Sequence, residues 1–408
     1  MRLVSSSWRD AVTYAKVEVR PGGERFAADA DRPDHPDHPD HPESPSFLRR
    51  VAVVDLNSRH VTWVMNRSHV HLVAPFISSS TEALVMDNVQ QPDVLGALLA
   101  MKSVELQSLR RLSLQKSSVS DADLAGALAG LPGLEMLDVS GSMFLRGDFL
   151  NALCDDGVVP RLRCLRMAGC GMHVESYRSA WDKVAAGGRG LEELVVCGNV
   201  LGDSELRCLG GLKETLRYLD VRRCSDVTFD GVYHVGNVLR LETFKVGPVF
   251  GVGVEEVWDA LSLSLSRRAR SSVGDRDRDR DRDRLVNLEL FGMEDAGGGA
   301  DPQSPDPDPE RLRFARLRMV SFMDTSVCWQ RLGALRHVEY LNVSRSLPVS
   351  INAANGNEYY GAGLAHAVSV AGLAFPRLKT FKASNSSLPW HVVQAVLEGA
   401  PVGVDIAL

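Results

Sequence analysis

Aliphatic side chains recur along this chain at a fixed short spacing. The pattern is Leu, two variable residues, Leu, one variable residue and a further aliphatic residue, followed by a small or polar one, as in LRRLSLQKS from Leu109. The fourth residue of successive copies falls at Val54, Leu84, Leu112, Leu137, Leu165, Leu194, Leu219, Phe244, Leu288, Leu317, Leu341 and Phe381. Most intervals are 24 to 29 residues, which indicates an array of about 12 repeated units.

Each copy predicts one short β-strand followed by a helix. Strand side chains point to alternate faces, so the aliphatic residues share one face, and stacked units bury it in a parallel sheet with a continuous core. Ser120 precedes Leu124 and Leu128 at helical spacing, which predicts a capped helix. Similar helices are expected at 181–186, 204–209, 232–239, 254–261 and 391–397, and GVDIAL at the C-terminus predicts an edge strand.

The period and the residue after each strand resemble leucine-rich repeats. Cys170, Asn199 and Cys224 stand where that family places Asn or Cys to bond the backbone of the turn. LRYLDVRRCSDVTFDGV resembles the cysteine-containing subclass, which is typical of F-box proteins and similar to the ribonuclease-inhibitor type. The resemblance implies an α/β solenoid over residues 47–408, with a curved parallel sheet on the concave face and helices on the convex face. A doubly wound α/β fold would not need the same leucines in every unit.

The N-terminus, MRLVSSSWRDAV, resembles the last helix of an F-box. The match implies that Leu3, Val4 and Trp8 contact a Skp-type adaptor, and that a cullin joins the complex. The F-box helices that precede this one in the family are absent from the 408 residues. We therefore interpret residues 1–20 as an F-box C-terminal remnant or, alternatively, as a helix that caps the solenoid through Trp8 and Val12.

Three low-complexity segments interrupt the pattern. Residues 21–46 contain DHPDHPDHP, whose proline at every third position predicts an extended, disordered linker. Residues 266–284 include five Asp-Arg pairs, and residues 294–310 are rich in Gly, Pro and Asp. Neither can bury apolar surface, so both are expected to be disordered inserts in the repeat domain.

Composition excludes several classes of function. The formal net charge of -6 argues against nucleic-acid binding, and no apolar run is long enough for a membrane span. Seven cysteines without paired CxxC spacing, and no apolar secretory segment, favour reduced thiols in the cytoplasm or nucleus. No phosphate-binding glycine loop, nucleophile motif or metal-ligand spacing is present. We therefore expect no catalytic residue, no metal and no cofactor, and interpret the chain as a binding protein that is not an enzyme.

The variable residues between the aliphatic ones are expected to face outward on the concave sheet. Aromatic residues, Met and Arg are enriched at interface hot spots. The residues predicted to contact a partner protein are Tyr218, Arg222, Phe291, Arg316, Arg318 and Tyr340. With the F-box resemblance, this surface implies the substrate-recognition subunit of an SCF-type cullin-RING ubiquitin ligase. The alternative is a leucine-rich-repeat scaffold or inhibitor-like protein unrelated to ubiquitin.

Overall fold

The computed structural model describes the repeat strands and most of the helices between them. The described residues are 16–19, 51–55, 70–102, 104–154, 161–172, 181–182, 190–238, 240–249, 257, 260–261, 285–291, 317–323, 326–328, 337–349, 375–386, 388 and 390–408. They belong to two compact units, Met1–Ser176 (unit 1) and Tyr177–Leu408 (unit 2).

Unit 1 contains strands in chain order within one sheet. They are β1 (Lys16–Val19), β2 (Val51–Asp55), β3 (Ala83–Val85), β4 (Arg111–Ser113), β5 (Met136–Asp138) and β6 (Cys164–Arg166). Strands β2 to β6 are parallel, with Leu84, Leu112, Leu137 and Leu165 in one register row. Strand β1 pairs antiparallel with β2, an element that the aliphatic pattern does not predict.

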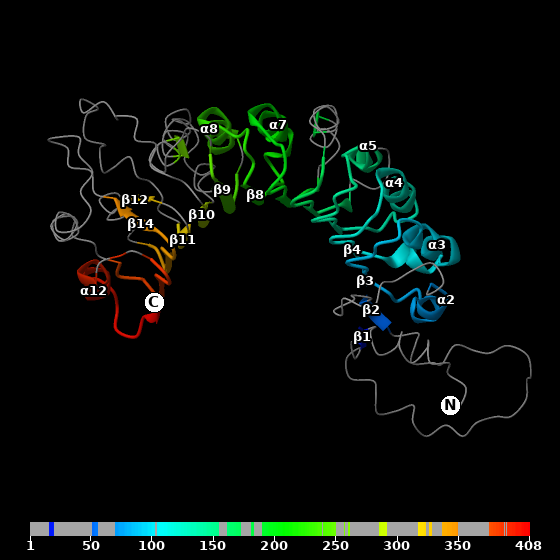
Figure 1. The fold of residues 1–408 in the computed structure, drawn as a ribbon, viewed down its shortest axis with the longest axis horizontal. Helices are drawn as coiled ribbons and strands as arrows, with labels where there is room; N and C mark the ends of the chain where they lie inside the picture. Colours follow the sequence, from blue (N-terminus) through cyan, green and yellow to red (C-terminus); the bar gives the residue numbers. More distant parts are fainter. Residues whose placement is uncertain are drawn as a thin grey trace, which may run out of the picture. The chain divides into compact units, whose positions relative to one another are not determined.

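The helices of unit 1 lie together on one side of its strands (Figure 1). They are α2 (Val70–Val73), η3 (Ala74–Phe76), α3 (Asp93–Lys102), η4 (Glu105–Ser108), α4 (Asp121–Ala129) and α5 (Phe149–Cys154). The expected cap of α4 is confirmed, because the Ser120 side chain accepts a hydrogen bond from the backbone N–H of Asp123.

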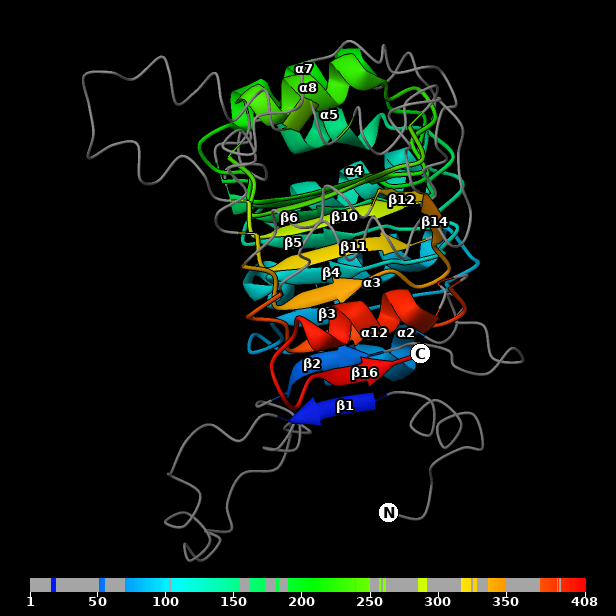
Figure 2. The same ribbon diagram turned by 90° about the vertical axis from the view of Figure 1, so that its left-hand side faces the viewer.

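Unit 2 continues the same strand-and-helix arrangement. Its main-sheet strands are β7 (Glu193–Val195), β8 (Tyr218–Arg222), β9 (Thr243–Gly247), β10 (Asn287–Phe291), β11 (Met319–Met323), β13 (Tyr340–Asn342), β15 (Thr380–Lys382) and β16 (Asp405–Ala407). Neighbouring strands in this order are parallel, and β10 and β11 run side by side in Figure 2. Strand β16 confirms the edge strand predicted from GVDIAL.

Helices of unit 2 follow several of these strands. They are α7 (Asp203–Cys208), η6 (Leu209–Leu212), α8 (Phe229–Val238) and α12 (Trp390–Glu398). Figure 1 shows α7 and α8 on one side of β8 and β9. A separate two-stranded sheet pairs β12 (Ser326–Cys328) with β14 (Leu347–Val349).

The repeated aliphatic positions form the core of each unit. The side chains of Leu134, Leu137 and Val139 in unit 1 are fully buried, as are Leu216 and Leu219 in unit 2. Aliphatic burial of this kind contributes about 25 cal/mol per Å² of surface removed from water. Both units are therefore α/β leucine-rich-repeat arrays, as the sequence predicted.

The repeat that the sequence predicts with Leu317 as its fourth residue begins three residues later in the structure. In the sheet, Val320 pairs in register with Leu288 on one side and Leu341 on the other. Leu317, Val320 and Phe322 are all buried, so Leu317 is the first residue of this copy and not its fourth. The sequence alignment was wrong here because Phe314, Leu317 and Met319 also satisfy the aliphatic spacing.

The turns after β3 to β8, β13 and β15 repeat one backbone conformation, with one residue at positive φ. Non-glycine residues with positive φ occur there, including Lys116 (54°) and Arg223 (57°). The next residue closes the turn with its side chain. Cys170 and Cys224 donate S–H bonds to the carbonyls of Val139 and Val196, and the Asn199 amide donates to Val196. These contacts confirm the turn-forming role predicted for the three residues.

Several sequence expectations lie outside the described residues. The F-box-like residues Leu3, Val4 and Trp8 do so, as do the 21–46 linker and the inserts at 266–284 and 294–310. Of the helix expected at 254–261, only Val257, Ala260 and Leu261 are described, and all three are buried.

Replacing Ser142 with Ala tests the contribution of these turns. The Ser142 hydroxyl donates to the Leu114 carbonyl at 2.8 Å and accepts from the Ser117 N–H at 3.2 Å. Without it, two buried backbone groups lose a partner, so the free energy of unfolding should fall by about 1–3 kcal/mol. Urea denaturation measures the change. Ser118→Ala, whose hydroxyl bonds an exposed Gln90, is the control and should change stability by less than about 0.5 kcal/mol. Equal effects in the two variants would contradict the turn's role.

Alkaline pH should destabilise the fold through the buried thiols. Burial raises the pKa of Cys170 and of Cys224 to about 12 from an ordinary value near 9. Between pH ~9 and ~12 these thiols ionise in the unfolded chain but stay protonated in the folded one. The contribution of the two thiols to the free energy of unfolding is therefore complete below pH ~9 and is lost as pH rises towards ~12. Urea midpoints across this pH window should fall, and should fall less steeply in a Cys170→Ser, Cys224→Ser variant. An identical pH dependence in both proteins would contradict this expectation.

Candidate partner-binding face

Every second side chain of the unit 2 strands points away from the core. We call the resulting surface the open face, since it lies opposite the side that carries α7 and α8. Tyr218, Arg222, Phe291 and Tyr340 occupy these alternate positions and are half-buried, whereas Leu219 between the first two is fully buried. Four of the six residues predicted to contact a partner therefore stand on one sheet face.

The other two predicted residues, Arg316 and Arg318, do not belong to this described surface. Arg316 lies outside the described residues. Arg318 precedes β11, where its backbone N–H bonds the Val286 carbonyl, and its side chain is 64% exposed at 3.7 Å from Glu339. The corrected register instead places Met319 and Met323 on the open face, each half-buried. Sequence reasoning assigned a basic surface to β11, and the structure shows a methionine-bearing one.

A charged cluster crosses three strands of the open face. Arg222 donates two hydrogen bonds to Asp220, from Nε at 3.0 Å and Nη2 at 2.7 Å, and a third from Nη1 to Glu289 at 2.5 Å. The ammonium of Lys245 lies 3.0 Å from the other Glu289 oxygen. The two acid side chains are only 3% and 11% exposed. Two cations and two carboxylates thus neutralise one another.

The pKa values of the cations reflect this pairing. Hydrogen bonding to Asp220 raises the pKa of Arg222 above its ordinary value despite burial. Burial is the largest single influence on the pKa of Lys245 and lowers it, but the hydrogen bonds and charges of Glu289 and Tyr218 together outweigh it, so the pKa rises. Charge-assisted bonds of this geometry hold side chains in fixed positions. Arg222 therefore stiffens the face and is poorly placed to bind a partner by its charge.

Three aromatic rings of the open face carry a cation over them. Lys245 lies 5.7 Å from the Tyr218 centroid, Arg223 lies 5.2 Å from the Phe291 centroid, and Lys382 lies 5.5 Å from the Tyr340 centroid. Such contacts are worth about 0.5–1 kcal/mol at exposed sites. Lys245 also pairs with Glu289, whereas Arg223 and Lys382 have no carboxylate within ion-pair distance among the described residues.

Gly247 allows β9 to approach the end of β10 closely. It lies in register with Arg222, between the strand that ends near Arg223 and the strand that ends at Phe291. A Cβ on Gly247 would stand 2.0 Å from the Phe291 carbonyl oxygen, and its φ of +119° disfavours any other residue. Because position 247 has no side chain, the backbones of β9 and β10 can lie this close together beside Phe291.

The corresponding sheet face of unit 1 carries polar side chains that bond one another. Asp87 accepts hydrogen bonds from the Ser113 hydroxyl and the Gln115 backbone, and the Gln115 amide donates to Asp138 at 2.9 Å. These short polar side chains bond one another along three repeats. Unit 1 therefore presents a polar surface without aromatic residues at these positions.

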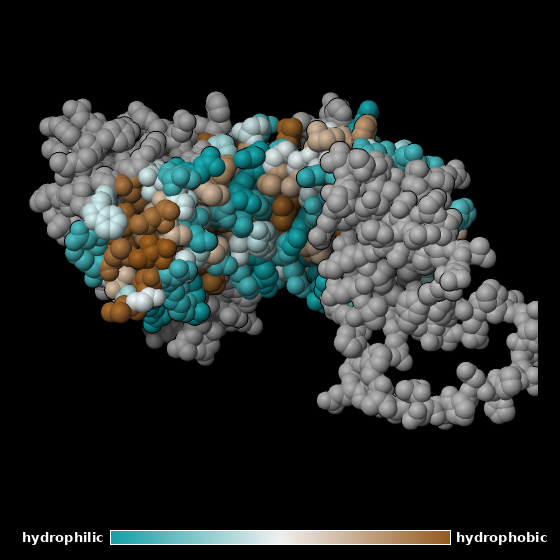
Figure 3. Space-filling model, turned by 60° about the horizontal axis from the view of Figure 1, so that its bottom comes forward, coloured by the Kyte–Doolittle hydropathy of each residue, from teal (hydrophilic) through white to brown (hydrophobic). Residues whose placement is uncertain are grey.

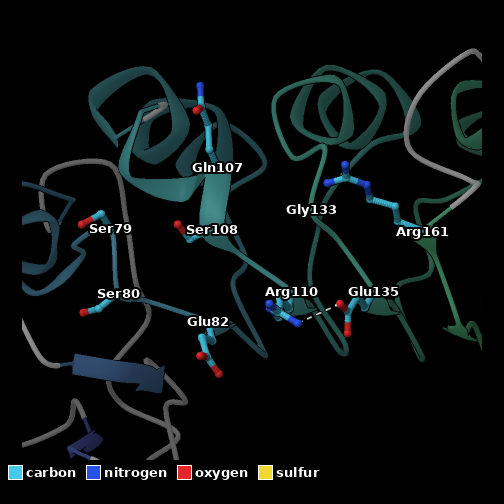
Figure 4. A pocket seen from close by; sticks show the side chains of 9 residues that line it. All are labelled: Ser79, Ser80, Glu82, Gln107, Ser108, Arg110, Gly133, Glu135 and Arg161. Atoms are coloured by element: carbon cyan, nitrogen blue, oxygen red, sulfur yellow. Dashed lines mark hydrogen bonds and ion pairs between the residues drawn. The ribbon is translucent and has the colours of Figure 1, made fainter. Parts of the chain in front are cut away.

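A polar hollow of about 540 Å³ lies where the strands of unit 1 begin (Figure 4). Its charged lining includes Arg110, which pairs with Glu135 at 3.0 Å, and these two side chains are 59% and 39% exposed. Glu82 and Arg161 add one charge of each sign. The hollow is open and electrically balanced, and we assign it no ligand.

Three further features of the described residues concern metal ligands, membrane-spanning helices and exposed apolar surface. No group of three His, Cys, Asp or Glu side chains among them could hold a metal ion. No described helix has the length and apolar character to cross a membrane. Figure 3 shows hydrophobic residues gathered on the visible face of unit 2 towards the C-terminus. There Ile406 is 42% and Leu408 is 62% exposed, so this end of unit 2 presents apolar surface.

Comparison with known proteins leaves the family open. No family model matches the chain, and no curated protein matches it. Among solved structures, a chain of the crystal structure of the Rad7 and Elc1 complex in yeast is similar, at a TM-score of 0.49 and 13% identity. The similarity covers 84% of this chain and 73% of that one. A likeness this distant carries no argument about partners, which must come from this chain's own residues.

Replacing Arg222 with Ala should destabilise unit 2 without any partner present. The change leaves the carboxylate of Asp220, 3% exposed, without its two bonds and removes one bond to Glu289. Removing one member of a largely buried pair should cost about 2–3 kcal/mol, below the fully buried case because Arg222 is 25% exposed. Urea denaturation checks this value. The neighbouring Arg223→Ala removes only a cation–π contact at an exposed position without a carboxylate partner, so it should lower stability by no more than about 0.5–1 kcal/mol. The opposite ranking would contradict the assignment.

Proposed function

We propose that this chain is a protein-binding module that captures a partner protein on the open face of unit 2 and catalyses no reaction itself. The supporting observation is that Tyr218, Phe291 and Tyr340 stand half-buried on one sheet face, backed by a filled core. Large aromatic side chains held on rigid strands supply contact area at low entropic cost, which is how interface hot spots work.

The N-terminal motif supports a narrower proposal about this partner. Residues 1–15 resemble the last helix of an F-box, with Leu3, Val4 and Trp8 at its contact positions. We infer that the captured protein is a ubiquitination substrate and that the chain is the substrate-recognition subunit of an SCF-type cullin-RING ligase. A Skp-type adaptor and a cullin would then be its other partners.

The second candidate is a leucine-rich-repeat scaffold or inhibitor-like binding protein unrelated to ubiquitin. It requires only the open face, which lies within the described residues. The ligase proposal requires the N-terminal motif as well. The two candidates therefore differ in one property, binding of the adaptor.

Site-specific cross-linking tests the partner-binding face. A photo-reactive amino acid replaces Asn287 on β10, and in a matched control it replaces the exposed Gln394 on α12. In cells, the Asn287 variant should cross-link one recurrent protein that the Gln394 variant does not. Tyr218→Ala combined with Tyr340→Ala should lower the yield of that adduct by about tenfold. Equal adducts from both positions, unaffected by the two substitutions, would contradict binding on the open face.

Co-purification tests the ligase proposal separately. The full chain is co-expressed with a Skp-type adaptor and compared with a Leu3→Ser, Trp8→Ala variant. We expect the adaptor to remain with the first protein through gel filtration and to separate from the second, because adaptor contact would depend on these apolar residues. The variant's urea midpoint controls for unfolding. An adaptor that separates from both proteins would favour the scaffold candidate and leave the open-face proposal standing.

A further inference from the structure

Two apolar pairs stand on neighbouring strands of the open face. Phe291 on β10 lies in register with Met323 on β11, and Met319 on β11 lies in register with Tyr340 on β13. All four side chains are half-buried. Met319 and Met323 are four residues apart on one strand, so the two pairs are separated by about 13 Å.

Each apolar pair has its own cation. Arg223 lies over Phe291, and Lys382 lies over Tyr340. Neither cation has a carboxylate within ion-pair distance among the described residues. The third cation of this type, Lys245 over Tyr218, is already neutralised by Glu289. Among the described residues, the two cations that flank the apolar pairs therefore form no ion pair, and the same face also carries the exposed Asp405, in register with Thr380 on β15.

The space between the pairs is filled by internal polar contacts. The Asn342 amide donates to the Ser321 hydroxyl at 3.2 Å, and Ser321 is 4% exposed. These groups satisfy each other and offer little to a partner. Binding energy on this part of the face must therefore come from the apolar pairs and the two cations.

From this arrangement we infer that β10, β11 and β13 take an acidic segment of the partner protein that carries two apolar side chains about 13 Å apart, the separation of residues i and i+4 in an extended chain. Each apolar side chain packs on one pair, and a neighbouring Asp or Glu meets Arg223 or Lys382. Charge complementarity identifies this occupant, because two cations beside apolar surface attract carboxylates and disfavour basic segments. The inference rests on the proposed function and names the chemistry of its partner.

Selection from a random 12-residue peptide library displayed on phage, against the full chain, tests this inference. Recovered sequences should be rich in Asp and Glu and contain two apolar residues. Fluorescence anisotropy of synthetic copies should give affinities that weaken as salt rises. Met319→Ser should weaken binding by about tenfold, as expected for loss of a packed apolar contact.

Substitution of the two cations tests how charge contributes to peptide binding without disturbing the fold. Arg223→Gly removes the guanidinium at a position whose φ of 57° favours glycine, so folding should not suffer. Arg223→Gly and Lys382→Gln should each weaken peptide binding by about three- to fivefold, the usual range for one exposed ion pair. Lys116→Gly, at the same repeat position in unit 1 with φ 54°, is the matched control and should leave binding unchanged.

The outcomes distinguish this inference from the proposed function. Peptides that lose binding in Tyr340→Ala but lack acidic residues would overturn the inference and leave the open-face proposal intact. Recovery of no peptide, or of peptides insensitive to every open-face substitution, would count against both. Residues 294–310 contain six acidic and no basic side chains. Binding that appears only when this segment is replaced by a Gly-Ser linker would overturn the inference by identifying the chain's own segment as the occupant.

Discussion

The structure depends on aliphatic side chains from successive repeats sharing one interior. Leu219 and Val221 of one strand meet the equivalent Phe244 and Val246 of the next, and all are almost completely buried. No repeat could bury this surface alone, so stability comes from stacking neighbours. Because this constraint fixes only the inward positions, the alternate positions are free to carry whatever side chains the function requires.

The same constraint determines how much of the fold the sequence could predict. Strong leucine positions such as Leu112 and Leu137 place their strands correctly, since no other register satisfies the spacing there. Around Leu317 two registers satisfy it, and only pairing of Val320 with Leu288 and Leu341 selects between them. The error in the candidate surface follows directly, because a three-residue shift along β11 exchanges Arg316 and Arg318 for Met319 and Ser321 and adds Met323 to the same face.

Other properties of the surface depend on contacts too distant in sequence to predict. Arg222 resembles an interface arginine until Glu289, 67 residues later, is found to accept its hydrogen bond. Conversely, nothing in the sequence pattern distinguishes Arg223 and Lys382 from other basic residues. Only the structure shows that they lie over Phe291 and Tyr340. The sequence therefore predicted which side chains of the strands lie on the open face, while the division of that face into a self-neutralised part and a part with unpaired cations required the three-dimensional pairing.

Thiol accessibility along β11 measures the central claim most directly. Single cysteines are introduced at Met319, Val320 and Met323 in separate proteins, and the labelling rate of each new thiol in the folded chain is followed by peptide mass spectrometry. The structure predicts rapid labelling at 319 and 323 and slow labelling at 320, because Val320 is buried with Leu317 and Phe322 while the methionines are half-buried on the open face. Rapid labelling at 320 with protection at 319 would contradict the register, and with it the surface on which partner binding is proposed.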